Sequence, residues 1–209
     1  MLTRLSAALA LLVLAAGCTP LAVFSTPPRV FKLTPAVDRQ DGAPVGWQLL
    51  VETPLTSAML NSTRIVLREE GGNLNYYSDA EWAEPLPEMI QGLMIESFEN
   101  TGRIVAIGRE TSGLRADYVL LTEIRDFYAE YQDGEPDKTA PTVRVRIRTK
   151  LVRMPRRTIE AGETFEATVR AGSPAMADIV QAYNTAFHDV ARRAAEWALR
   201  PGQRPAGGR

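Results

Sequence analysis

Residues 142–154 alternate between apolar and basic side chains, and this pattern constrains the fold more than any other stretch of the sequence. Successive side chains of a β-strand point to opposite faces, so a period of two gives a strand one apolar face and one polar face. The pattern predicts a long strand with one face on a core and the other face open. The inward set is Val143, Val145, Ile147, Thr149 and Leu151, and the outward set is Arg144, Arg146, Arg148 and Lys150.

Two more long strands are predicted beside this one. Residues 158–170 alternate in the same way, and residues 116–131 carry apolar side chains at every second position until the phase slips at Phe127. A slip of one residue turns every later side chain to the other face, so we predict a β-bulge near Arg125 and Asp126. Polar turns separate the three segments, which indicates a three-stranded meander.

Two amphipathic helices complete the pattern. Residues 85–101 have apolar side chains at three- and four-residue spacing, and Gly102 stands at the position just past the helix end. A second helix is expected to begin with Ser173 as its N-cap and Pro174 at its first position, and its apolar stripe continues to Trp197. One apolar stripe per helix predicts that both helices pack on one face of the sheet.

The first part of the chain predicts shorter elements. A Gly-Gly-Asn turn at residues 71–73 is expected to join two strands in a hairpin, and the capping-box spacing of Ser78 and Glu81 predicts a helical turn before the first helix. The segments expected as short strands are 30–33, 47–52, 63–68, 74–77 and 104–107. Together the elements predict an α+β fold over residues 29–199, a two-layer sandwich with a mixed, mostly antiparallel sheet and two main helices packed on one face.

The chain begins with the features of a lipoprotein signal peptide. Arg4 precedes an apolar run from Leu5 to Ala16 that is too short to span a bilayer, and Cys18, the only cysteine, follows Ala-Ala-Gly. This arrangement resembles the lipobox of bacterial lipoproteins, in which the thiol is diacylated and the preceding peptide is removed. We therefore predict a signal peptide over residues 1–17 and a diacylglycerol-modified, palmitate-bearing Cys18. An ordinary signal peptide with a chance cysteine is the alternative.

Lipidation would hold the rest of the chain at a membrane surface outside the cytoplasm, because two or more acyl chains anchor a protein stably. Thr19 follows Cys18, whereas Asp at that place retains Gram-negative lipoproteins on the inner membrane. The sequence therefore favours the periplasmic face of the outer membrane. The proline-containing residues 18–28 are predicted to form an extended, lipidated tether, and the Gly- and Pro-rich residues 200–209 a disordered tail.

The composition excludes several classes of function. The 24 basic and 25 acidic residues nearly balance, so there is no electrostatic case for nucleic-acid binding. The single cysteine leaves no disulfide, and with only one histidine, His188, the chain lacks the usual ligands of zinc and transition metals. No residue pattern indicates a nucleophile beside a base or a phosphate-binding loop. We therefore predict no catalytic residue, no metal and no cofactor, and a protein that is not an enzyme.

The basic stripe is the first candidate docking surface. Arg144, Arg146, Arg148 and Lys150 share one face of one predicted strand. The simpler interpretation is a solvated sheet face whose charges pair with glutamates on neighbouring strands. The alternative is a surface that docks an acidic partner or lipid headgroups. The glutamates considered as partners are Glu123, Glu163 and Glu166.

An aromatic group is the second candidate docking surface. Tyr76, Tyr77 and Trp82 lie close together in the sequence where the hairpin leads into the first helix. Core packing is the simpler interpretation. The alternative is a partner-binding hot spot, since Trp and Tyr dominate such sites.

Several segments together resemble the ABC-type transport auxiliary lipoprotein family. They are the lipobox, Val-Phe-Lys-Leu at 30–33, Arg-Ile-Val-Leu at 64–67, the run from Tyr76 through Trp-Ala-Glu-Pro to Leu86, residues 96–103 and residues 116–120. Members of this family accompany transporters with MCE (mammalian-cell-entry) domains, which move lipids between the inner and outer membranes. The resemblance implies a small α/β sandwich without catalytic residues that docks on an MCE-domain protein and an ABC permease and ATPase.

Other functions remain open at this point. A lipoprotein that acts as an envelope scaffold, or that activates a peptidoglycan synthase, is the main alternative, and an unrecognised envelope hydrolase is a more distant one. Self-association into a homo-oligomer is compatible with the transport role and with the scaffold role.

Overall fold

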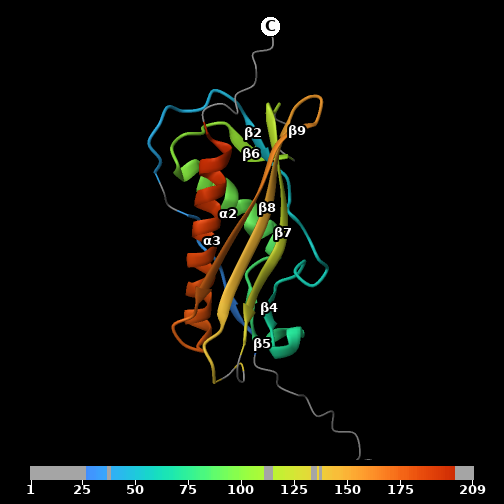
Figure 1. The fold of residues 1–209 in the computed structure, drawn as a ribbon, viewed down its shortest axis with the longest axis vertical. Coiled ribbons are helices and arrows are strands. Elements are labelled where there is room, and N and C mark those ends of the chain that lie inside the picture. The colour runs from blue at the N-terminus through green and yellow to red at the C-terminus, as the bar shows by residue number, and fades with distance from the viewer. Residues whose placement is uncertain (1–26, 37–38, 111–114, 133–135, 137, 201–209) are drawn as a thin grey trace, which may run out of the picture.

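Strand β7 (Tyr118–Glu130) is the axis of the sheet in the computed structural model, which describes residues 27–36, 39–110, 115–132, 136 and 138–200 (Figure 1). One edge of β7 pairs along its length with the antiparallel strand β8 (Thr142–Arg153), which in turn pairs with β9 (Thr158–Arg170). The three-stranded meander is therefore confirmed.

The other edge of β7 is shared by three short parallel strands, which follow one another along it. They are β2 (Leu49–Val51), β3 (Leu55–Thr56) and β4 (Arg64–Arg68). Beyond them, β6 (Ile107–Arg109) pairs with β2, β5 (Leu74–Trp82) with β4, and β1 (Arg29–Phe31) with β5. The sheet is thus mixed, as predicted. A 3-10 turn, η1 (Glu70–Gly72), joins β4 to β5 with two glycines at positive φ, which glycine adopts without steric cost.

The predicted bulge lies in the middle of β7. The pairing with β8 shifts from Ile124 opposite Ile147 to Asp126 opposite Arg146, which leaves Arg125 as the extra residue. The extra residue restores the apolar phase, so Phe127 is buried on the same face as Ile124.

Two helices, α2 (Leu86–Asn100) and α3 (Met176–Ala198), cover one face of the sheet and leave the other face open (Figure 1). The core between the layers contains the inward side chains of β7 and β8 and the apolar stripes of both helices. At its centre Trp82 meets Tyr183 edge-on, with ring centroids 5.2 Å apart, and Phe127 stacks on Tyr183 at 5.0 Å. The two-layer α+β architecture is confirmed.

Three predicted boundaries are wrong. The segment from Ser78 to Trp82, expected as a helical turn, is the end of β5, because it pairs with β4 on one side and β1 on the other. These non-local pairings outweigh the local capping signal. The strand expected at 104–107 is displaced and forms β6. Helix α3 begins at Met176 rather than beside Ser173, whose hydroxyl instead accepts from the Ala175 N–H and donates to Asp178.

Within the described residues, neither helix has the length and apolar character that crossing a bilayer requires. The predicted signal peptide, Cys18 and the predicted tail at 201–209 lie outside the described residues, as does the tether up to residue 26. Strand β1 is the first element of the part of the chain that the structure describes.

Candidate docking site on the open sheet face

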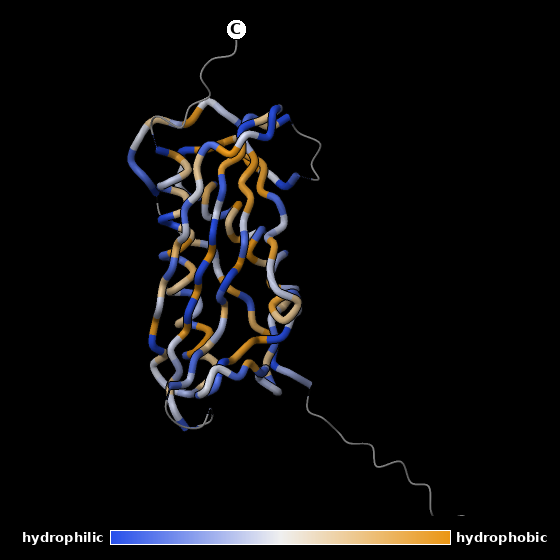
Figure 2. The backbone as a smooth tube through the Cα atoms, turned by 45° about the vertical axis from the view of Figure 1, so that its right-hand side comes forward, coloured by the Kyte–Doolittle hydropathy of each residue, from blue (hydrophilic) through white to orange (hydrophobic). Residues whose placement is uncertain are grey.

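The basic stripe of β8 lies on the sheet face that the helices leave open. Each of its four cations is half-buried, whereas the residues between them are buried against the helices. Figure 2 shows hydrophilic and hydrophobic residues alternating along the long strands. The predicted geometry of the stripe is therefore present.

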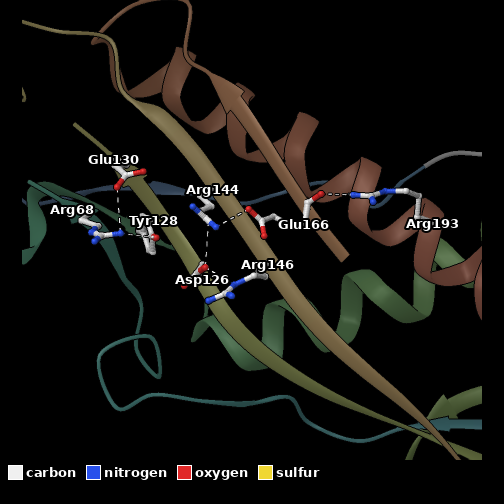
Figure 3. A network of polar contacts seen from close by, with 8 residues as sticks. All are labelled: Arg68, Asp126, Tyr128, Glu130, Arg144, Arg146, Glu166 and Arg193. Carbon is white, nitrogen blue, oxygen red and sulfur yellow. Dashed lines mark hydrogen bonds and ion pairs between the residues drawn. The ribbon is translucent and has the colours of Figure 1, made fainter. Parts of the chain in front are cut away.

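Arg144 and Arg146 are compensated by carboxylates on both neighbouring strands (Figure 3). Oδ2 of Asp126 lies 2.6 Å from Nε of Arg146 and 3.4 Å from Nε of Arg144, and Glu166 Oε1 lies 2.7 Å from Nη2 of Arg144. The short polar contact with Asp126 raises the pKa of the Arg146 guanidinium above its ordinary value. This half of the stripe is an internal network that joins β7, β8 and β9.

The network differs in part from the predicted one. Glu166 is a partner of the stripe, as one interpretation expected, but Glu123 pairs with Arg125 at 3.2 Å instead. Asp126, which sequence reasoning missed, supplies the central carboxylate. The signal was present, because a bulge at Arg125 necessarily turns Asp126 to the open face.

Arg148 and Lys150 form the other half of the stripe. The Arg148 guanidinium donates a long hydrogen bond of 3.5 Å to the Thr164 hydroxyl, and Lys150 stands between Leu121 on β7 and Gly162 on β9. Among the described residues, no carboxylate forms an ion pair with either cation. Glu123 stands opposite Arg148 on β7 but pairs with Arg125 instead, so within the described residues neither of these two positive charges forms an ion pair.

A small apolar cluster borders these two charges. Leu50, Val119 and Val152 are buried together on the open face, separate from the main core, and Leu121 and Met154 pack against them. Ile159, opposite Val152 on β9, is 57% exposed. The open face thus has an apolar end, then two cations that form no ion pair among the described residues, and then the ion-paired network of Arg144 and Arg146. We refer to Arg148, Lys150 and this apolar cluster as the open-face patch.

The aromatic candidates do not form a surface group. Trp82 is only 2% exposed in the core, so its side chain offers no surface to a partner. Tyr76 lies under the Arg64 guanidinium, 3.7 Å from ring centroid to carbon, and donates to the Met59 carbonyl at 3.3 Å. The hydroxyl of Tyr77 lies 2.7 Å from that of Tyr131. The docking role considered for Trp82 is therefore corrected to core packing, because strand β5 turns its indole inward.

The described residues contain no group of three or more His, Cys, Asp or Glu side chains placed to hold a metal ion. The single histidine, His188, is half-buried on α3, and its Nε2 lies 3.0 Å from the Thr34 carbonyl oxygen. The Thr34 hydroxyl lies 3.1 Å from the same nitrogen, so the imidazole has two polar contacts with this one residue. The histidine therefore fixes the segment after β1 to α3.

The family model of the ABC-type transport auxiliary lipoprotein component matches residues 31–195. The chain belongs to this family. The family predicted from the sequence is thereby confirmed. The family is named for a role in transport rather than for a catalytic activity. The matched residues extend from β1 almost to the end of α3, so the family domain includes both the open-face patch and the core beneath it.

Solved structures share the fold of this auxiliary lipoprotein. The crystal structure of protein XCC0632 from Xanthomonas campestris has a TM-score of 0.76 and 28% sequence identity, over 84% of this chain and 97% of that one. A second crystal structure, of an uncharacterized protein, has a TM-score of 0.64 and 12% identity over 82% and 98% of the two chains, which shows the fold alone.

A curated relative is the uncharacterized protein bll6063 of Bradyrhizobium diazoefficiens. It is 28% identical over 151 residues, which are 72% of this chain. The aligned part spans only 39% of the length of that relative.

Proposed function

We propose that this auxiliary lipoprotein serves an MCE-type ABC lipid transport system, from the periplasmic face of the outer membrane, by docking rather than by catalysis. Membership of the family supports a role beside an ABC transporter. The MCE-domain partner, the permease and the ATPase come from the resemblance described above. The outer membrane is inferred from Thr19, which follows the predicted lipidation site Cys18.

Anchoring of the protein to a membrane would allow a docking surface of low affinity to hold a partner. Acyl chains on Cys18 would confine the domain to a thin layer beside one membrane, which raises its effective concentration at a partner that reaches across the periplasm. Strand β1 begins at Arg29, which is 29 − 18 = 11 residues beyond Cys18. A fully extended chain spans about 3.3 Å per residue, so the tether sets a maximum reach of roughly 35 Å.

The observation that carries the proposal is the open-face patch. Two cations without an ion pair, beside an apolar cluster that is bordered by the exposed Ile159, make a surface that suits a partner with an acidic rim and apolar contacts. Arg144 and Arg146 each pair with a carboxylate of a neighbouring strand, whereas Glu123, which stands opposite Arg148, pairs with Arg125 and leaves Arg148 available to a partner.

Recovery of partners from detergent-solubilised membranes tests this proposal. The wild-type lipoprotein should retain an MCE-domain protein and an ABC permease, and Arg148→Gln/Lys150→Gln should retain at least threefold less of both. Arg29→Gln/Lys32→Gln is the matched control, because it removes the same charge from an exposed part of the chain outside the patch and should bind as wild type. Absence of both transporter proteins from the wild-type sample would contradict the proposed system, and equal recovery by the two double variants would contradict the proposed surface.

The anchor is tested separately by mass spectrometry and fractionation. We expect an acylated Cys18 at the amino terminus of the mature protein in outer-membrane fractions, and release of Cys18→Ala from the membrane. A bare thiol on an unprocessed chain would contradict this part of the proposal.

A further inference from the structure

We propose that a cavity at the end of α3 binds a small molecule that carries a carboxylate or phosphate group on an apolar body. The cavity lies between the loop before β2, Arg103 and the two residues that follow α3, Leu199 and Arg200, and has a volume of about 460 Å³. Sites for small molecules typically have about 300–1,000 Å³, so this one suits a ligand with a single short chain. It is distinct from the open-face patch and does not depend on the proposed function.

The loop that forms the cavity is pinned at both ends. The Gln40 N–H donates to the Thr101 carbonyl at 3.1 Å, and the Val45 N–H donates to the Arg103 carbonyl at 2.7 Å. The residues between these two hydrogen bonds therefore arch away from the segment after α2. In Figure 1 this blue loop passes beside the end of α3 at the top of the molecule. Because both ends of the loop are hydrogen-bonded to the segment after α2, the cavity beneath the loop is formed by the fold itself.

One side of the cavity is apolar. Trp47, Val45 and Leu199 contribute to its lining. The Trp47 ring is held edge-on against Tyr118, with centroids 5.1 Å apart, and is only 5% exposed. The indole is therefore a fixed wall against which an apolar chain can pack.

The polar side of the cavity is cationic. Arg103 and Arg200 both line it, against one exposed carboxylate, that of Asp41. Nη2 of Arg103 donates to the Leu199 carbonyl at 2.8 Å, but its Nε is buried without a hydrogen-bond partner. Among the described residues, no carboxylate forms an ion pair with either arginine. A guanidinium that is half-buried and has no counter-charge favours an anionic ligand group.

Gly42 keeps the loop close to this guanidinium. A side chain there would begin 3.1 Å from Nε of Arg103, and the glycine has a φ of +136°. A Cβ at this position would crowd the guanidinium, and residues other than glycine rarely adopt this φ, so glycine favours the close approach of the loop to the cation. The placement of the Arg103 guanidinium beside the apolar wall thus depends on the glycine at position 42.

Titration of the full chain carrying Cys18→Ala, which keeps acyl chains off the protein, tests the site. Decanoate and octyl phosphate are the probes, octyl glucoside is the neutral comparison, and inorganic phosphate is the comparison without a chain. In ¹H–¹⁵N spectra we expect the indole N–H signal of Trp47, assigned with Trp47→Phe, to shift saturably, while that of Trp82 stays fixed. Octyl glucoside and inorganic phosphate should each bind at least tenfold more weakly than octyl phosphate.

Two variants at the exposed Ala43 keep the test independent of folding. Ala43→Glu adds a negative charge to the cavity lining and should weaken octyl phosphate binding about tenfold, whereas Ala43→Lys should bind at least as tightly as wild type. Equal binding by the two variants, equal binding of octyl glucoside, or an unmoved Trp47 signal would each overturn the proposal. Vesicles of phosphatidylglycerol identify the source of the anionic group: a Trp47 shift with vesicles indicates a membrane headgroup, and a shift with decanoate or octyl phosphate alone indicates a free amphiphile.

Discussion

Oδ2 of Asp126 on β7 lies 2.6 Å from Nε of Arg146 on β8, and the contact exists because of the bulge between Ile124 and Asp126. Without the extra residue, Arg125 would continue the outward alternation and stand opposite Arg146, so that two cations would face each other. Like charges directly opposite on a sheet are destabilising. The bulge therefore corrects both the apolar phase of the core face and the charge pattern of the open face.

Asp126→Asn should lower the free energy of unfolding by about 1 kcal/mol, because it removes the carboxylate shared by Arg144 and Arg146. The side chain of Asp126 is 14% exposed and that of Arg146 is 35% exposed, so the value lies below that of a fully buried charged hydrogen bond. Urea unfolding at neutral pH measures the change. Glu123→Gln is the matched control, since Glu123 pairs with Arg125 at a more exposed position, and it should cost less than about 0.5 kcal/mol. Equal losses in the two variants would contradict the central role of Asp126.

The elements that sequence reasoning predicted well are those with long, regular patterns. The alternation in β8, the phase slip in β7 and the stripe in α3 each extend over many residues of one element, so they report local geometry directly. The short segment from Ser78 to Trp82 carries no such length. Its strand conformation depends on pairing with β1, about fifty residues earlier in the chain, which no local signal at residues 78–82 contains.

The open-face patch was only partly predictable. The sequence placed four cations on one face, but their compensation depends on which carboxylates reach them across β7 and β9. The cavity at the end of α3 was not predicted, because residues 41–46 resemble any Gly- and Pro-rich loop. Their position beside Arg103 is set by backbone hydrogen bonds to residues about sixty positions later.

Trp82→Ala should lower the free energy of unfolding by about 3–5 kcal/mol, as is usual when a large aromatic side chain is removed from a core. Trp82 contacts both Tyr183 and Phe127 and is 2% exposed, so little rearrangement can fill the space. Chemical denaturation measures the loss. Leu55→Ala, at a position that is 75% exposed, should change stability by less than about 0.5 kcal/mol. A stable Trp82→Ala protein that has lost only partner binding would contradict the core assignment.

Asn184→Leu should loosen the segment that follows β1. Oδ1 of Asn184 accepts hydrogen bonds from the Thr34 N–H at 2.9 Å and from the Thr34 hydroxyl at 3.2 Å. Loss of the first bond costs about 1 kcal/mol locally, which corresponds to an increase of about fivefold in amide exchange at Thr34. Hydrogen exchange followed by NMR measures it. Gln181→Leu, at an exposed position of the same helix, is the control and should leave exchange at Thr34 unchanged.

The stability of the domain should fall at high pH, and Tyr183 should account for part of the decrease. Burial raises the pKa of Tyr183 well above its ordinary value of 10.0, and the hydroxyl donates to the Val66 carbonyl at 3.2 Å. The unfolded chain releases this proton from about pH 10 upward, whereas the folded protein keeps it, so the contribution is complete below pH 10 and decreases above it by about 1.4 kcal/mol per pH unit.

Tyr183→Phe isolates this contribution, because Phe cannot ionise and every other group, including Tyr118, is the same in both proteins. At pH 8 the variant should be about 1 kcal/mol less stable than wild type, owing to the lost hydrogen bond. By pH 10 the difference should have shrunk by about 0.4 kcal/mol and by pH 11 by about 1.4 kcal/mol, so that it falls to zero or slightly reverses, because only the wild type is destabilised by ionisation of the unfolded state. Urea unfolding of both proteins at pH 8, 9, 10 and 11 measures the difference, and a gap that stays constant or widens would show that Tyr183 does not carry the raised pKa.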